Sequence, residues 1–402
     1  MLTHIILILF FLCGCNNNAK EKQEEETINS LDPVIIDVTQ VKETKTPLKL
    51  SQFADSISYI RLSEYDSEFS MFETAITIID DTIFLDNDNL HKYTPEGKFI
   101  KKIFNSKQNR IEARKVSKRS AFNKKERNIA IRTYSKSSNS ANFKYELYSF
   151  DGVYVGESKY ELENRYKIIE TYFDNYCIYR IDTIASANTK INRLGQNLFY
   201  AENIETNSVF YSYPNPASKE SFPFHDNSDY LPGNMNFISL DSVLWFKHFV
   251  IDTLYCTKDF VTIQPRYIFK TDESFMTLSD YTQLKNGVLD ENRLKKLNKI
   301  WGVLPLPATE NILFTINRSI AIADKSGNIT GCTMQPVIND LDEYLKNIDI
   351  AMYIIERFFY VENNYLYLLI AAESFFKEGC KPPFENLTEK SNPIVLKIKL
   401  KS

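Results

Sequence analysis

The sequence predicts an all-β protein, and three observations support this fold class. The 402 residues include 28 Phe and 24 Tyr, and aromatic side chains favour the pleated, half-buried surface of a strand. Past Thr46 the helical period is nearly absent, and short apolar runs alternate with turn residues instead. Because there are only 11 Gly, we expect Asn and Asp to form many of the turns, since both tolerate the left-handed conformation.

The first strand-turn-strand unit lies between residues 56 and 104. Ser56 to Leu62 alternates between apolar and polar residues, and two short apolar runs then flank Asp80-Asp81. Thr94-Pro95-Glu96-Gly97 has Pro second and Gly fourth, as in a β-turn, and Lys98 to Phe104 alternates again. Strands joined by tight turns form a meander, which is the unit of a β-propeller blade.

Similar units recur along the rest of the chain. They lie at Tyr145–Val155, Tyr176–Ile181, Asn197–Tyr213, Ser242–Phe246, Thr253–Cys256, Pro265–Phe269, Asn311–Ala323, Phe358–Ile370 and Pro393–Leu400. Ser279 to Lys299 is the one clear helical candidate, with a period near 3.6. About 355 residues at roughly 40–45 per blade would give eight blades, and long insertions would reduce the number to six or seven.

Several short segments, in order along the chain, resemble one family. They are Leu48–Leu62, Ile78–Ile103, Ile251–Tyr255 with Pro265–Tyr267, Ala371–Phe375 and Asn392–Val395. These segments are similar to parts of the six-bladed β-propeller lipoproteins common in Bacteroidetes. The resemblance implies six blades and a lipoprotein, but no established activity. Asn105 to Arg119 departs from the family, because it is basic and free of Gly where relatives often have a Gly-rich loop.

The N-terminus has the features of a lipoprotein signal peptide. Ile5 to Leu12 is an unbroken apolar run, too short to span a bilayer but suited to a signal peptide. Leu12-Cys13-Gly14-Cys15 resembles a bacterial lipobox, which implies cleavage after Gly14 and diacylglycerol on the Cys15 sulfur. No Lys or Arg precedes the apolar run, which departs from the usual pattern.

These features divide the chain into three parts. Residues 1–14 form the signal peptide, residues 15–46 a lipidated Cys with a flexible polar tether, and residues 47–402 the propeller. The acidic run Lys20 to Glu26 resembles the surface-export signal of Bacteroidetes lipoproteins, although a merely solvated linker explains it equally well. We therefore expect an outer-membrane lipoprotein that faces either the periplasm or the cell surface.

The sequence contains no catalytic constellation. His91, His225 and His248 are far apart and lack the spacing of metal ligands. Four cysteines remain besides the anchor and Cys13, namely Cys177, Cys256, Cys332 and Cys380. They form no CxxC motif, and we expect free core thiols rather than disulfides.

Two acidic clusters superficially resemble calcium loops. Asp86 to Asn89 and Asn339 to Asp342 both lack the twelve-residue register that ends in a ligating Glu, so turn chemistry explains them better. We therefore predict no cofactor and no metal site. The alternative hypothesis is a propeller hydrolase or lactonase with a divalent cation, such as calcium, in its central channel. This hypothesis rests on analogy of fold alone.

The most unusual feature is a basic stretch. Between Gly97 and Lys136 there are 14 Lys and Arg against two Glu, so this stretch carries about +12 although the whole chain carries −4. Lys115, Lys118 and Arg119 are its candidate contacts to an anionic polysaccharide, lipid head groups or an acidic partner. The alternative is a solvated blade edge whose Lys residues discourage edge-to-edge pairing.

The sequence thus favours a binding or scaffolding propeller of the cell envelope. Its expected partners are the membrane, through the lipid anchor, and a glycan, peptide or envelope protein. Nucleic acid is excluded as a partner by the expected export, and the oligomeric state is left open.

Overall fold

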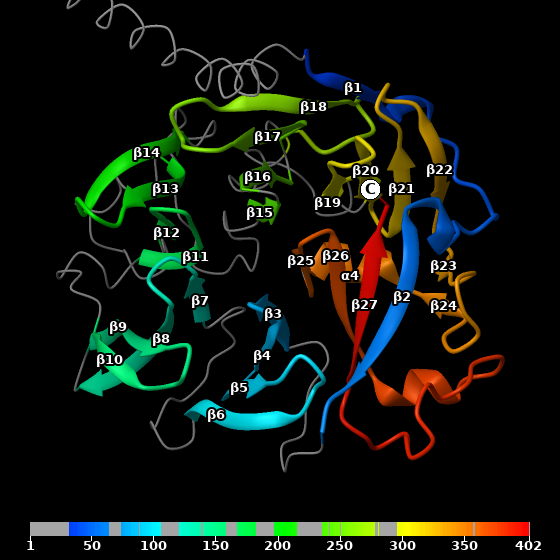
Figure 1. Cartoon of the computed structure of the whole chain (residues 1–402). Coiled ribbons are helices and arrows are strands. Elements are labelled where there is room, and N and C mark those ends of the chain that lie inside the picture. The colour runs from blue at the N-terminus through cyan, green and yellow to red at the C-terminus, as the bar shows by residue number, and fades with distance from the viewer. Residues whose placement is uncertain are drawn as a thin grey trace, which may run out of the picture.

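The structure is a computed structural model. It describes residues 32–63, 74–87, 89–105, 120–137, 140–157, 167–181, 197–214, 235–240, 242–249, 251–277, 280, 296–356 and 358–401. Six sheets of four or five strands stand in a ring about a central axis (Figure 1). The prediction of a six-bladed β-propeller is therefore confirmed, and the alternatives of seven or eight blades are wrong.

The first five blades are antiparallel meanders in chain order. Blade 1 consists of β3 (Ala75–Ile79), β4 (Thr82–Asp86), β5 (Asn89–Tyr93) and β6 (Phe99–Asn105). Blade 2 consists of β7 (Ser120–Asn123), β8 (Asn128–Ser137), β9 (Ser140–Ser149) and β10 (Tyr154–Glu157). Blade 3 consists of β11 (Lys167–Phe173), β12 (Tyr176–Ile181), β13 (Asn197–Asn203) and β14 (Ser208–Pro214). Blade 4 contains β15 (Met235–Leu240), β16 (Val243–His248), β17 (Thr253–Thr257) and β18 (Gln264–Lys270). Blade 5 consists of β19 (Ile300–Leu306), β20 (Asn311–Ile316), β21 (Ser319–Ala323) and β22 (Ile329–Thr333).

The first strands of neighbouring blades contact one another, so they line the axis.

Blade 6 closes the ring by joining the two ends of the folded body. Its inner strands are β25 (Phe359–Glu362), β26 (Tyr365–Ile370) and β27 (Ile394–Leu400), and its outer strand is β2 (Ala54–Arg61). β2 pairs antiparallel with β27, with Tyr59 opposite Leu396. The first and last strands of the propeller are thus held together by backbone hydrogen bonds.

An N-terminal segment, residues 34–53, runs outside blades 4 and 5 before it enters blade 6. We call it the strap. Its strand β1 (Val34–Asp37) pairs in parallel with β18 as the fifth strand of blade 4, with Val34 opposite Tyr267. Further along, the Thr44 amide donates to the Cys332 carbonyl of blade 5 over 2.8 Å.

The strap corrects one predicted boundary. Residues 34–46, which the sequence analysis assigned to the flexible tether, belong to the folded body. Ile36 and Val38 are 0% and 2% exposed, because they pack on the edge of blade 4. The alternation of apolar residues at 34–38 is short and follows a long polar segment, so the sequence pattern did not predict a strand there.

Non-glycine residues form the inner turns, between the first and second strands of the blades. Asp80, Asp81, Asp174, Asn363 and Asn364 have φ angles between 47° and 62°. This confirms that Asp and Asn take the left-handed positions for which the chain lacks glycine. Arg127, Ser242 and Glu310 occupy the corresponding positions in the other three blades, which composition did not predict.

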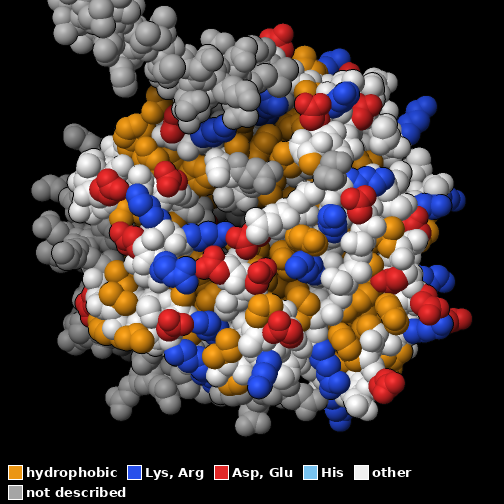
Figure 2. All heavy atoms as spheres, in the orientation of Figure 1, with side chains coloured by type: hydrophobic (Ala, Val, Ile, Leu, Met, Phe, Trp, Pro, Cys, Tyr) orange, Lys and Arg blue, Asp and Glu red, His pale blue; other side chains and the backbone are white. Residues whose placement is uncertain are grey.

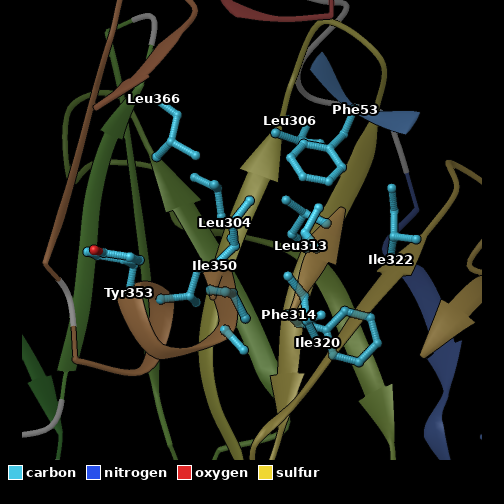
Figure 3. Packing of buried hydrophobic residues seen from close by; sticks show 14 of the residues in the cluster. Phe53, Leu304, Leu306, Leu313, Phe314, Ile320, Ile322, Ile350, Tyr353 and Leu366 are labelled. Atoms are coloured by element: carbon cyan, nitrogen blue, oxygen red, sulfur yellow. The ribbon is translucent and has the colours of Figure 1, made fainter. Parts of the chain in front are cut away.

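A large hydrophobic core joins blades 4, 5 and 6 to the strap. The helix α4 (Ile350–Glu356) lies in the connection between blades 5 and 6, after the short hairpin of β23 (Val337–Ile338) and β24 (Asn347–Ile348). Ile350 of α4 lies beside Leu304 of β19 (Figure 3), whereas the Tyr353 hydroxyl points away from Leu304 and donates to the Leu369 carbonyl over 2.7 Å. Within the described ranges, no helix is both long and apolar enough to cross a membrane.

The helical insertion predicted for 279–299 lies mostly outside the described residues. Asp280 and Lys296 are helical, whereas Asn298 forms an isolated parallel bridge with Phe275. The predicted end at Lys299 is therefore too late, because the chain is already extended toward β19.

Candidate functional site

The alternation of antiparallel strands gives the propeller two different faces. The inner turns at residues 80–81, 124–127, 174–175, 307–310 and 363–364, together with Ser242, lie on the face that we call the turn face. The blade-to-blade connections start and end on the opposite face, which we call the connection face. Residues near the axis on either face come from different blades, so ligands can contact several blades there.

The inner turn of blade 2 is the most charged inner turn that the structure describes. We call Lys124-Lys125-Glu126-Arg127 the basic turn. Lys124 pairs with Glu362 of blade 6, and Arg127 Nη1 lies 2.7 Å from Asp80 Oδ2 of blade 1. Lys125 Nζ lies 3.0 Å from Glu205 Oε1 of blade 3 and also donates to Asn175. One turn therefore reaches three other blades.

The three basic side chains are held in place yet remain open to solvent. The side chains of Lys124, Lys125 and Arg127 are 53%, 47% and 66% exposed. Exposed ion pairs contribute little to stability, about 0–1 kcal/mol each. Their effect here is to fix the positions of charged groups that a ligand can contact.

Lys124 has the most structured environment of the three. Its Nζ lies 5.8 Å from the centre of the Tyr360 ring, at the channel-lining strand β25. Burial lowers the pKa of Lys124, but Tyr360 and Glu362 outweigh it, so the net pKa is raised. Burial also raises the pKa of Tyr360 to about 12, although Lys124 opposes it. Both groups therefore keep their protons at neutral pH.

A second unusual cation lies inside the fold. Lys247 of β16 is 3% exposed, and its Nζ donates to the His248 carbonyl over 2.9 Å. The same Nζ lies 5.7 Å from the centre of the Phe269 ring. Burial lowers the pKa of Lys247 to about 7, although Asp252 partly opposes this. The sequence pattern around Lys247 predicts only a strand and does not reveal the buried amine.

The structure places the predicted residues in several different locations. Cys15, Lys115, Lys118 and Arg119 lie outside the described residues, as does His225. His91 and His248 are buried in strands β5 and β16. Burial, together with Lys102, lowers the pKa of His91 to about 4.

The four cysteines in the described part of the chain are not joined in disulfides. Cys177, Cys256 and Cys332 are buried, and Cys380 is half-buried. Burial raises the pKa of Cys256 and of Cys332 to about 11. The thiols of Cys256 and Cys332 are therefore protonated at neutral pH.

The side chains of the two acidic clusters form hydrogen bonds within the fold, most of them inside local turns. Asn87 Oδ1 accepts from the Asn89 amide over 2.8 Å, and Asp86 accepts from the Ser120 amide over 3.0 Å. In the second cluster, Asn339 Nδ2 donates to Asp342 Oδ1 over 2.7 Å. Among the described residues, no group of three or more His, Cys, Asp or Glu is placed to hold a metal ion.

The described part of the basic stretch serves two roles. Lys101 and Lys102 lie on β6, the outer edge strand of blade 1, as the interpretation of a basic blade edge expects. The basic turn instead lies at the axis and pairs with acidic residues. The sequence pattern did not place these residues in a turn or beside Glu362, which is more than two hundred positions away.

Comparison with known protein families matches only part of the chain. A family model described as a domain of unknown function, DUF4933, matches residues 18–151. These residues extend from the tether into blade 2. No curated protein matches the chain.

Solved structures give broader coverage. A crystal structure described as an exported protein from Bacteroides fragilis is 12% identical, with a TM-score of 0.54, over 92% of this chain and 100% of that one. A member of the DUF4221 family from Bacteroides vulgatus is 13% identical, with a TM-score of 0.43, over 87% of this chain and 97% of that one. An inactive virginiamycin B lyase from Staphylococcus aureus is 11% identical, with a TM-score of 0.32, over 68% and 73%. This last likeness is too distant to bear on activity.

The match to the Bacteroides fragilis protein covers almost the whole chain and all of its counterpart. It agrees with the resemblance that the sequence indicated. The chain is a six-bladed β-propeller that shares its fold with an exported protein of Bacteroides.

Proposed function

We propose that this protein is an outer-membrane lipoprotein whose propeller binds an anionic glycan or an acidic peptide of the cell envelope at its turn face. The observation that supports this most is the basic turn. Its three cations are about half exposed and are held by partners on three different blades. A rigid, charged surface of this kind loses little conformational entropy when a ligand binds.

The proposed lipid anchor rests on the sequence motif around Cys15. Leu12-Cys13-Gly14-Cys15 resembles a lipobox, so acyl chains on Cys15 would hold the propeller at the membrane. Cys15→Ala should abolish incorporation of radiolabelled palmitate. Cys13→Ala is a matched control, because it removes a neighbouring thiol and keeps the lipid acceptor. Equal labelling of Cys15→Ala and the parent chain would show that the anchor is wrongly placed.

The proposed binding of an anionic ligand predicts that the basic turn of blade 2 contributes to affinity. Lys124→Gln, Lys125→Gln and Arg127→Gln together remove three positive charges and keep side chains that can form hydrogen bonds. Affinity for oligogalacturonate, whose only charges are carboxylates, or for a glutamate-rich peptide should fall by about tenfold or more. Affinity for both probes should also decrease with salt.

A matched variant tests whether the effect is local. Lys346→Gln, Lys381→Gln and Lys390→Gln remove the same charge from exposed residues of the connection between blades 5 and 6 and of blade 6. This variant should retain the parent affinity. If both triple variants lose the same affinity, the net charge of the chain accounts for binding and the turn face is not the site.

Lys115, Lys118 and Arg119 are proposed as a second, separate set of contacts to the same class of ligand, because the connection from β6 to β7 that contains them starts and ends on the connection face and not on the turn face. Reversing their charges should weaken binding of oligogalacturonate and leave the melting temperature nearly unchanged. A large fall in melting temperature would mean instead that these residues are paired within the fold.

A further inference from the structure

The direction of β1 fixes where the N-terminal chain leaves the propeller. β18 runs away from the turn formed by residues 258–263, which lies on the turn face between β17 and β18. Since β1 is parallel to β18, it also starts on the turn-face side of blade 4. Residues 32 and 33 therefore enter the body at the outer rim of blade 4, on this side.

The same rim carries exposed apolar side chains. Val209 and Phe210 at the start of β14 are 52% and 49% exposed, and Val261 in the turn between β17 and β18 is 72% exposed. Further along the edge of blade 4, Ile35 of β1 lies opposite Ile268 of β18 and is 58% exposed. We call these four residues the apolar rim.

Aromatic contacts join the parts of the rim that belong to blades 3 and 4. The ring centre of Tyr176 lies 5.4 Å from that of Phe210 and 5.1 Å from that of Phe260, the neighbour of Val261. Figure 2 shows hydrophobic side chains gathered over the part of the molecule that contains β14. The ring contacts thus link exposed Phe210 of blade 3 to the turn of blade 4 that carries exposed Val261.

We infer that the apolar rim rests in the interfacial layer of the phospholipid membrane to which Cys15 is anchored. This inference rests on the proposed function, because the anchor brings the rim to the lipid. The 18 residues between Cys15 and Val34 would span about 25 Å if they were flexible, so the rim at which they enter stays close to the bilayer.

The chemistry of the rim fits a lipid surface. Partly exposed Val, Ile and Phe side chains gain up to about tenfold each in membrane affinity when they enter an apolar layer. Tyr176 combines an apolar ring with a hydroxyl, as do the aromatic side chains found at membrane interfaces. Lys258 and Asp259, which precede Val261 in the same turn, carry opposite charges, so contact does not require anionic lipid.

If the apolar rim contacts the membrane, residues on the connection face of blade 6 should lie away from it. Blade 6 carries η7 (Ala372–Phe376) in the connection between β26 and β27, on the connection face. Phe376 there is 39% exposed. It is an exposed aromatic residue on the face away from the apolar rim, and it provides a matched control.

The test uses tryptophan as a depth probe in the lipidated, full-length protein. Val261→Trp and Phe376→Trp are each reconstituted into vesicles of phosphatidylethanolamine and phosphatidylglycerol that contain lipids brominated on their acyl chains. The parent chain, measured in the same vesicles, gives the contribution of Trp245 and Trp301. Phe210→Trp repeats the test on blade 3.

We expect bromolipid to quench the fluorescence of Val261→Trp and Phe210→Trp and to shift their emission to shorter wavelength, with Phe376→Trp unaffected. Equal quenching at Val261 and Phe376, or none at either, would overturn the inference. If palmitate still labels Cys15 in that case, the anchor stands and only the rim is wrong. A blue shift at Val261 without quenching would also overturn it, because a protein surface rather than lipid would then cover the rim. Loss of the label would overturn the anchor and this inference together.

Discussion

A β-carbon on Gly327 would lie 2.1 Å from the carbonyl oxygen of Ile35. Gly327 lies in the outer turn of blade 5, and Ile35 lies in β1, the outermost strand of blade 4. Gly97 of blade 1 has the same φ of 83° and the same relation to the Arg61 carbonyl of β2, at 2.2 Å. The strap therefore packs against blade 5 in the way that the closing strand packs against blade 1.

Gly327→Ala should destabilise the protein because it combines a left-handed backbone with this close contact. The backbone alone costs about 1–3 kcal/mol, and displacement of the strap adds to it. The midpoint of urea unfolding should fall, and limited proteolysis should cut the strap sooner. Ser326→Ala, at the exposed neighbouring position, should leave both measurements unchanged. If Gly327→Ala is as stable as the parent chain, the contact with Ile35 is not tight.

Lys247→Met should stabilise the protein below neutral pH. The pKa of Lys247 is about 7 in the fold against 10.5 in the unfolded chain, so the unfolded state binds more protons between these values. Stability of the parent chain should therefore rise with pH from about 7 to 10.5, and below pH 7 the full cost of burying the charged amine applies. That cost has an upper limit of about 5 kcal/mol.

The comparison is made by urea unfolding of both chains at pH 6 and pH 10. Met fills a similar volume without a charge, so its advantage over Lys should be large at pH 6 and small at pH 10. An advantage that does not change with pH would mean that packing, and not ionisation, separates the two chains.

Lys124 and Glu362 should be coupled across the ring. A double-mutant cycle with Lys124→Met and Glu362→Gln should give a coupling energy of about 0.5–1 kcal/mol, because Glu362 is only 17% exposed. Lys381 and Glu343 form the control pair, since their side chains are 63% and 68% exposed. Their coupling energy should be close to zero. Equal coupling in the two cycles would contradict the special position of the basic turn.

The four thiols should react in two stages. In the native protein, Cys380 should react first with a thiol reagent such as 5,5′-dithiobis(2-nitrobenzoate), because it is only half-buried. Cys177, Cys256 and Cys332 should react only after denaturant is added. Cys380→Ser should remove the fast phase and leave the slow phase intact. A fast phase that survives this change would show that the core opens locally.

The sequence predicts the parts of this fold better than their arrangement. Alternating apolar residues identify most strands, and Asp80-Asp81, Asn363-Asn364 and Gly97 mark turns that the structure contains. These features are local, so a single stretch of chain determines them. The parallel pairing of β1 with β18 and the ion pair between Lys124 and Glu362 depend on which blades lie side by side, and local periodicity carries no such information. Lys247 was missed because a single charged residue in a strand is normally assigned to a solvent-exposed face.

Closure of the ring by β2 and β27 affects how the chain can fold. Blade 6 takes one strand from residues 54–61 and its neighbour from residues 394–400, so the ring cannot close until nearly the whole polypeptide has emerged. Pairing over such a long sequence separation is slow. A chain that crosses a membrane from its N-terminus must therefore complete translocation before β27 can pair with β2 and close the ring. Under the proposed export, the ring therefore stays open until that moment.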